Sequence, residues 1–192
     1  IISSLIECVN KPEFVFKDYY LREDFMIKNA IPTAEGAIKI ALNERNSTIF
    51  KSECLVIGYG RIGKILSQML KNMGAKVTIS ARNAKDFAWA NLNDFKTINI
   101  STHSKKLHSD IVFNTVPTEI LDYNALKLLK NTDLIIDLAS PPGGVNKTLA
   151  EKFKIKVISA LGIPGKHFPK TAGEIVCDVI YQIIEEENLW KK

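Results

Sequence analysis

The chain contains the motif Glu53-Cys54-Leu55-Val56-Ile57-Gly58-Tyr59-Gly60-Arg61-Ile62-Gly63. An apolar run long enough for one buried parallel strand is followed at once by Gly-x-Gly-x-x-Gly and then by an amphipathic helical pattern. Gly58 permits the tight turn after the strand, Gly60 lets the backbone approach a pyrophosphate, and Gly63 lets the helix pack against the strand. The free amides at the helix start, at Arg61 and Ile62, then face the anion. This arrangement predicts dinucleotide binding.

Strands and helices alternate along the rest of the chain. Strands are predicted at 53–57, 77–80, 97–100, 110–114, 134–138 and 156–160. Helices are predicted at 61–73, 84–94, 104–108, 119–130 and 146–153, with a final amphipathic helix at 171–187. Such alternation is typical of an α/β fold in which a parallel sheet is covered on both faces. We expect a doubly wound Rossmann fold of about six strands in the order 3-2-1-4-5-6, with flanking helices from a truncated second domain.

The segment before the sheet does not form a complete strand-helix unit. Residues 1–31 mix aromatic and charged side chains, which favours a remnant of an N-terminal, substrate-binding domain. Pro32 disfavours helix at the residue before it, and Thr33 is a suitable N-cap. We therefore expect the chain to stop and restart here, with a separate linking helix in 32–46 that has Glu35 in its first turn.

The first residue is Ile1 rather than Met, so we expect the chain to be a piece of a longer protein. The flanking helices are expected at the junction with the missing part, because one follows the connection from it and the other has an apolar stripe but no later strand to cover. The expected parts are a substrate-domain remnant, a linking helix, a Rossmann domain and a C-terminal junction helix, at 1–31, 32–46, 47–170 and 171–192. Apolar surface left exposed by the missing part tends to be covered by a second copy of the chain. We expect a homo-oligomer formed through 1–45 and 171–190, with contributions from Phe25, Ile27, Ile180 and Ile184.

Composition limits the possible partners. The 192 residues are 46% hydrophobic and carry a net charge of +5 that is spread through the sequence. The sequence has no basic run interleaved with aromatic residues, the pattern that would favour nucleic-acid binding. It also has no apolar run that approaches the ~20 residues needed to span a bilayer. The histidines lack metal-ligand spacing, so no metal is expected. Cys8, Cys54 and Cys177 form no C-x-x-C pair and indicate reduced thiols, which predicts a cytoplasmic location.

The residues after the second predicted strand favour NADP over NAD. An NAD-preferring domain usually places Asp or Glu about 20 residues past the glycine motif, where it binds the ribose hydroxyls. This chain has Ser80-Ala81-Arg82-Asn83 instead. A hydroxyl and a guanidinium suit a 2′-phosphate, and the missing carboxylate removes a repulsion. We therefore expect Ser80, Arg82 and Asn83 to bind NADP, with NAD as the other possible cofactor.

Three further loops reach the same edge of the predicted sheet. Thr115, Val116 and Pro117 follow the fourth strand and are expected beside the dinucleotide, whereas Asn114 either joins them or only ties down the turn. Asp137 ends the fifth strand, where it is either an inward polar group or a strand-end cap. The loop after the sixth strand, residues 162–173, carries an adjacent lysine and histidine between glycines and prolines, Lys166 and His167.

Several stretches together resemble the family of the dipicolinate synthase A subunit. They are NAIPTAEGA at 29–37, GYGRIG at 58–63, NTVP at 114–117, IDLASPPGG at 136–144 and ALGIPGK at 160–166. The resemblance covers the chain from about Tyr19 and lacks the family's N-terminal half-domain. It implies a two-subunit enzyme of spore-forming bacteria, in the mother-cell cytosol, in which the dipicolinate synthase B subunit is flavoprotein-like. The implied reaction oxidises dihydrodipicolinate to dipicolinate, with NADP as hydride acceptor.

The resemblance also implies a dicarboxylate substrate, which gives Lys166 a carboxylate to bind and His167 a ring proton to take. Otherwise Lys166 only borders the cleft and His167 packs under Phe168. Two alternative functions stay open. One is another two-domain dehydrogenase, of the shikimate, alanine or methylene-tetrahydrofolate type. The other is a non-catalytic dinucleotide-sensing domain, although such domains commonly keep an acidic residue where this chain has Ser80-Ala81-Arg82.

Overall fold

The computed structural model of the protein describes residues 17–103, 105 and 107–187. It contains one parallel sheet in the order β3-β2-β1-β4-β5-β6, which confirms the predicted fold class and strand order. The strands are β1 Glu53–Ile57, β2 Lys76–Ser80, β3 Lys96–Ile98, β4 Ile111–Asn114, β5 Leu134–Asp137 and β6 Lys156–Ser159. The carboxyl ends of the central strands lie level, because Ile57 pairs with Ser80 and Asn114, and Asn114 pairs with Asp137.

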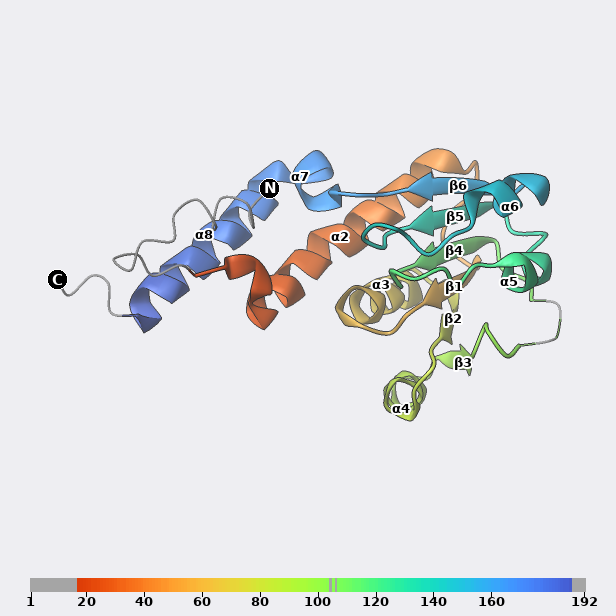
Figure 1. The fold of residues 1–192 in the computed structure, drawn as a ribbon, viewed down its shortest axis with the longest axis horizontal. Helices are drawn as coiled ribbons and strands as arrows, with labels where there is room; N and C mark the ends of the chain where they lie inside the picture. The colour runs from red at the N-terminus through yellow and green to blue at the C-terminus, as the bar shows by residue number, and fades with distance from the viewer. Residues whose placement is uncertain (1–16, 104, 106, 188–192) are drawn as a thin grey trace.

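Helices cover both faces of this sheet (Figure 1). They are α2 Glu23–Glu44, α3 Arg61–Asn72, α4 Ala84–Leu92, α5 Tyr123–Leu128, α6 Lys147–Lys152, α7 Ile163–His167 and α8 Pro169–Glu186, with a 3-10 helix η1 Tyr19–Leu21. Side chains alternate along β1, as a strand requires. Cys54 and Val56 join a core with α2 and α3, whereas Leu55 and Ile57 join a second core with α5 and α6.

The predicted break at Ile31-Pro32-Thr33 is wrong. One helix, α2, runs through Pro32, which is buried in its interior. The missing N–H of Pro32 leaves Lys28 O, four residues earlier, without its helical hydrogen bond. The Thr33 hydroxyl donates to a different carbonyl, Asn29 O, at 2.8 Å. Burial of Ala34 and other small residues of α2 on the sheet then outweighs the local preference. Glu35 is consequently exposed in the middle of a helix and not in a first turn.

Other elements differ from the predictions mainly in length. Helix α5 is shorter than the predicted 119–130, and the region 104–108 is not helical at its described residues 105, 107 and 108. The loop predicted at 162–173 instead contains α7 and the first turn of α8. No helix among the described residues is long and apolar enough to cross a membrane.

Figure 1 shows α8, η1 and the N-terminal part of α2 extending beyond the sheet. They pack on one another through a small separate core of Phe25, Val179 and Ile183. Arg22 adds an ion pair with Glu186 at 2.6 Å. Phe25 is only 3% exposed, so its predicted contribution to a self-association surface is wrong. The predicted remnant begins with residues 1–16, which lie outside the described residues.

Candidate cofactor site

The glycine motif forms the turn between β1 and α3. Gly58 has φ +93°, in the left-handed region, and its N–H donates to Ser80 O at 2.9 Å. A Cβ on Gly58 would collide with the Thr115 hydroxyl, and a Cβ on Gly63 would collide with the Gly58 carbonyl oxygen. The turn therefore requires glycine at position 58, and the close approach of α3 to β1 requires it at position 63.

Gly60 has different surroundings. A Cβ added there would meet no protein atom within 4 Å, so the backbone faces open space. Gly60 is the N-cap of α3 and supplies no side-chain cap, and first-turn N–H groups such as those of Arg61 and Ile62 lack intrahelical partners. The positive end of the helix dipole adds to their attraction for anions. These residues fit a pyrophosphate that takes the space a side chain at position 60 would fill.

A cleft of about 280 Å³ extends from this loop across the ends of β2 and β4. We call it the cofactor cleft. It brings together the predicted glycine loop, the segment after β2 and the segment after β4. Its lining residues are Ile57, Gly58, Tyr59, Gly60, Ser80, Ala81, Arg82, Asn83, Asp86, Thr115, Val116, Pro117 and Ile120.

Two of the predicted NADP ligands, Ser80 and Arg82, lie in different environments. Ser80 is buried at the end of β2, and its hydroxyl oxygen accepts a hydrogen bond from Ile100 N–H at 3.2 Å. The Ser80 hydroxyl hydrogen can still be donated to a ligand. Arg82 is exposed, and of the described residues that line the cofactor cleft it alone is cationic. A guanidinium in this position can contact a phosphate through two N–H groups.

Asn83 serves mainly as the cap of α4. Its side-chain oxygen accepts from Asp86 N–H at 2.7 Å, and its amide nitrogen donates to Asp86 Oδ2 at 2.8 Å. Asp86, which was not among the predicted site residues, brings a carboxylate into the cofactor cleft. The capping pattern of Asn followed by Asp three residues later is visible in the sequence and could have indicated it. The hydroxyl hydrogen of Thr115 is also already used within the protein, because it is donated to Ile57 O at 2.9 Å.

The sequence profile of one protein family matches residues 33–163, which include the glycine loop and the whole sheet. The family is described as "D-isomer specific 2-hydroxyacid dehydrogenase, NAD binding domain". The chain belongs to this family. A dinucleotide cofactor agrees with the predicted glycine motif and with the open cradle at Gly60.

The chain is also homologous to the A subunit of dipicolinate synthase, and the resemblance inferred from the motifs is confirmed. That subunit from Bacillus subtilis (strain 168) is 38% identical over 168 residues, which are 86% of this chain and 56% of that protein. Crystal structures of the same subunit from Bacillus halodurans and from B. subtilis both give a TM-score of 0.86, at 33% and 32% identity. They cover 95% and 96% of this chain, which spans 62% and 61% of those chains.

The chain therefore spans less than two thirds of the length of these relatives. The crystal structure of transhydrogenase from Sinorhizobium meliloti is a more distant match, 14% identical with a TM-score of 0.67. The match covers 84% of this chain and 56% of the transhydrogenase chain. At this identity the match shows a shared fold.

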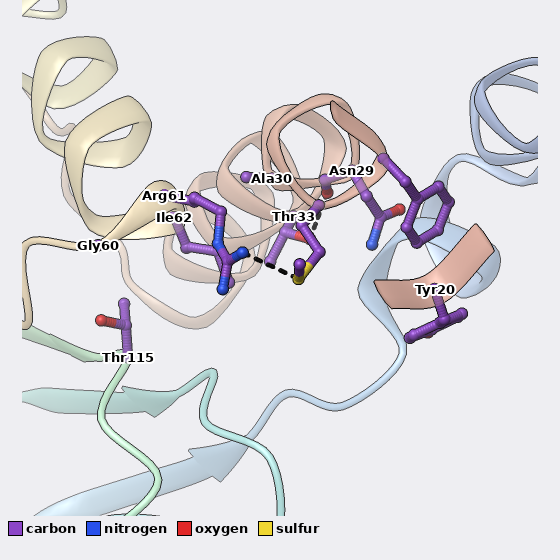
Figure 2. Close-up of a pocket in the computed structure, with 10 residues that line it drawn as sticks. Tyr20, Asn29, Ala30, Thr33, Gly60, Arg61, Ile62 and Thr115 are labelled. Carbon is purple, nitrogen blue, oxygen red and sulfur yellow. Dashed lines mark hydrogen bonds between the residues drawn. The ribbon is translucent and has the colours of Figure 1, made fainter. Parts of the chain in front are cut away.

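A second cleft, of about 310 Å³, lies between the glycine loop and α2 (Figure 2), and it shares Gly60 and Thr115 with the cofactor cleft. We call it the α2 cleft. The Arg61 guanidinium reaches across it and donates to Glu23 Oε2 at 2.7 Å and to Met26 Sδ at 2.9 Å. Apolar and polar groups share its walls. They are Tyr20, Phe25, Met26, Asn29, Ala30, Thr33, Gly60, Arg61, Ile62 and Thr115. Asn29 belongs to the stretch 29–37 that carries the family resemblance, but it was not among the predicted site residues.

The predicted catalytic residues, Lys166 and His167, lie on α7 and line neither cleft. Lys166 is exposed, and the half-buried His167 ring lies 6.4 Å from the Phe168 ring. Their catalytic role stays a prediction. Among the described residues, no three His, Cys, Asp or Glu side chains gather as a metal site would require.

Proposed function

We propose that the chain is the NADP-binding part of a dehydrogenase subunit that oxidises dihydrodipicolinate to dipicolinate. The observation that carries the proposal is the match to the dipicolinate synthase A subunit over 86% of this chain. The proposal includes the B subunit of dipicolinate synthase as a partner and a homo-oligomeric form of the A-type subunit. Oxidation of a dihydropyridine yields an aromatic ring, so the protein has mainly to bind, orient and exclude water.

The cofactor cleft has the groups that NADP would need. The amides of Arg61 and Ile62 would hold the pyrophosphate, and Val116 and Pro117 would form the wall along the adenosine. Arg82 would bind the 2′-phosphate. When bound, NADP supplies the acceptor for hydride.

The preference for NADP over NAD depends on the balance of charge in this cleft. Asp86 would repel a 2′-phosphate, but its carboxylate accepts a hydrogen bond from Asn83 on the side of the α4 cap. Arg82 is exposed and has no ion pair with any residue that the structure describes. The attraction of Arg82 is therefore expected to outweigh the repulsion of Asp86.

The α2 cleft is the proposed position of the substrate ring. It adjoins Gly60, and its apolar side chains can contact a flat ring while Asn29 and Arg61 hydrogen-bond carboxylates. Lys166 and His167 are retained as candidates for binding a substrate carboxylate and for taking the ring proton. Both would have to act from α7.

The decisive experiment assays the full-length protein, with and without its B-type partner. We expect formation of the aromatic product, followed by its ultraviolet absorbance, to require NADP and dihydrodipicolinate. The proposal would be contradicted if the product formed without NADP, or if the protein oxidised other substrates but not dihydrodipicolinate.

A second candidate function is a dehydrogenase that acts on a different small acid. The observation that favours it is the family description, which names 2-hydroxyacid dehydrogenases and NAD. A panel of 2-hydroxy acids in the same assay, with NAD and with NADP, separates the two candidates.

A further inference from the structure

A buried pair of polar side chains links the ends of β4 and β5. Asp137 is 3% exposed and Asn114 is fully buried, and the two are register partners in the sheet. Asn114 Nδ2 donates to Asp137 Oδ1 at 2.8 Å. Neither residue lines the cofactor cleft or the α2 cleft. A buried carboxylate is costly unless several donors surround it, and Asp137 has donors on both of its oxygens.

The first set of contacts runs from Asp137 through Asn114 to the segment after β4. Asn114 Nδ2 also donates to Val116 O at 3.0 Å, and Asn114 Oδ1 accepts from Val116 N–H at 3.2 Å. An ionised carboxylate only accepts hydrogen bonds. Asp137 therefore fixes which way the Asn114 amide points, and this orientation lets the amide hold both polar groups of Val116.

The second set runs from Asp137 through the loop after β5. Gly144 N–H donates to Asp137 Oδ2 at 3.1 Å. The carbonyl oxygen of Gly144 in turn accepts from Ile120 N–H at 3.1 Å and from Leu121 N–H at 2.9 Å. The loop lies so close to the pair that a Cβ on Gly144 would collide with the Asn114 amide. Both ends of segment 116–121 are therefore tied to one carboxylate.

We propose that Asp137 is a positioning residue that holds segment 116–121 as one wall of the cofactor cleft. Val116, Pro117 and Ile120 of this segment line the cleft, together with the residues that follow β2. Asp137 itself lies behind this wall and acts on the cleft through Asn114 and Gly144. The identity of the ligand rests on the proposed function, whereas the ordering of the wall does not.

The first test needs no cofactor. Asp137→Asn keeps the shape of the side chain but places an N–H₂ group against a donor, either the Asn114 amide or Gly144 N–H. We expect amide hydrogen exchange in peptides from 116–121 and 138–144 to become at least about tenfold faster, while exchange in α3 stays as in the parent. Asp178→Asn, which removes an exposed carboxylate on α8, is the matched control and should leave both regions unchanged.

The second test measures binding of NADPH and of 2′,5′-ADP, which carries only the adenosine half of the cofactor. Asp137→Asn should weaken both ligands by a similar factor, about tenfold, at a temperature where the variant is folded. Asn114→Ala should also weaken binding of both ligands. In the double variant Asp137→Asn, Asn114→Ala, the fold-loss of affinity should be smaller than the product of the two single-variant losses, because the residues share one set of contacts.

The proposal would be overturned if amide hydrogen exchange in 116–121 were the same in Asp137→Asn as in the parent. It would also be overturned if Asp137→Asn were less stable but bound 2′,5′-ADP as tightly as the parent. If Asp137→Asn is unfolded, the same exchange and binding measurements on Asn114→Ala test the proposal. If the parent binds neither nucleotide, the proposed function fails, and the exchange measurement alone still tests the ordering of the wall.

Discussion

Gly60 is the residue at which a side chain would compete with the cofactor and not with the protein. Its φ of −80° suits any residue, and a Cβ there would meet open space. We expect Gly60→Val to keep the fold but to weaken NADPH binding by at least about tenfold, because the side chain takes the pyrophosphate position. Circular dichroism and fluorescence titration test this. Gly173→Val, at another uncrowded glycine, is the control, and parent-like affinity in Gly60→Val would refute the assigned cradle.

Cys54 is the residue from which a pH dependence follows. Burial in β1 raises the pKa of its thiol from 9.0 to about 12. Because the folded pKa lies above the unfolded one, this contribution to stability is complete below pH ~9 and is lost as the pH rises toward ~12. We expect the denaturation midpoint to fall between pH ~8 and pH ~11, and to fall less in Cys54→Ala. Burial also raises the pKa of Tyr59, so some alkaline dependence should persist in the variant.

Thiol labelling provides an independent check on Cys54. The exposed Cys177 should react with a disulfide reagent at pH ~8 in the folded protein, whereas Cys54 should react only after denaturant is added. Equal labelling rates for the two thiols would contradict the assigned burial.

The sequence allowed the site to be predicted at the level of which loops meet. Parallel strands end at one edge, so the glycine loop, Ser80, Arg82 and Val116 had to lie together. The partner of each side chain could not be predicted in the same way. Asn83 caps α4, and Asn29 enters the α2 cleft only because α2 is continuous. Such contacts depend on the packing of distant elements and not on local pattern.

At the scale of elements, α2 shows why a proline was misleading. The rule that proline ends a helix describes an isolated segment, where no tertiary packing offsets the lost hydrogen bond. In α2, Pro32 is buried, and burial of Ala34, Ala37 and Ala41 against the sheet holds the helix together. The strands were easier to predict, since buried parallel strands are continuous apolar runs bounded by turns.

The packing of α8 on α2 depends on Phe25. Its ring lies 5.1 Å from those of Tyr19 and Tyr20, and its side chain contacts the core formed with Val179. We expect Phe25→Ala to lower the free energy of unfolding by about 3 kcal/mol. Chemical denaturation followed by circular dichroism measures this loss. Ile27→Ala removes an exposed residue of the same helix and should change stability by less than about 0.5 kcal/mol, so equal losses would contradict the assigned core.

At the scale of the whole molecule, α2 and α8 carry exposed apolar side chains. Ile27 is 46% exposed and Ile180 is 40% exposed, whereas Ile184 is half-buried. We expect the 192-residue chain to self-associate through these helices, so that its mass by light scattering rises with concentration. The double variant Ile27→Lys, Ile180→Lys should shift this rise to higher concentration. A strict monomer at all concentrations, or the same association in the variant, would contradict the expectation.

The central claim is that this chain binds NADP(H) in preference to NAD(H). Calorimetric titration of the parent chain and of Arg82→Ala with NADPH and with NADH tests it most directly. The parent should bind NADPH at least about tenfold more tightly than NADH, and Arg82→Ala should lose most of that difference by weakening NADPH alone, because the guanidinium makes a charge-assisted contact with the 2′-phosphate. Tighter binding of NADH by the parent, or equal losses for both nucleotides in Arg82→Ala, would contradict the claim.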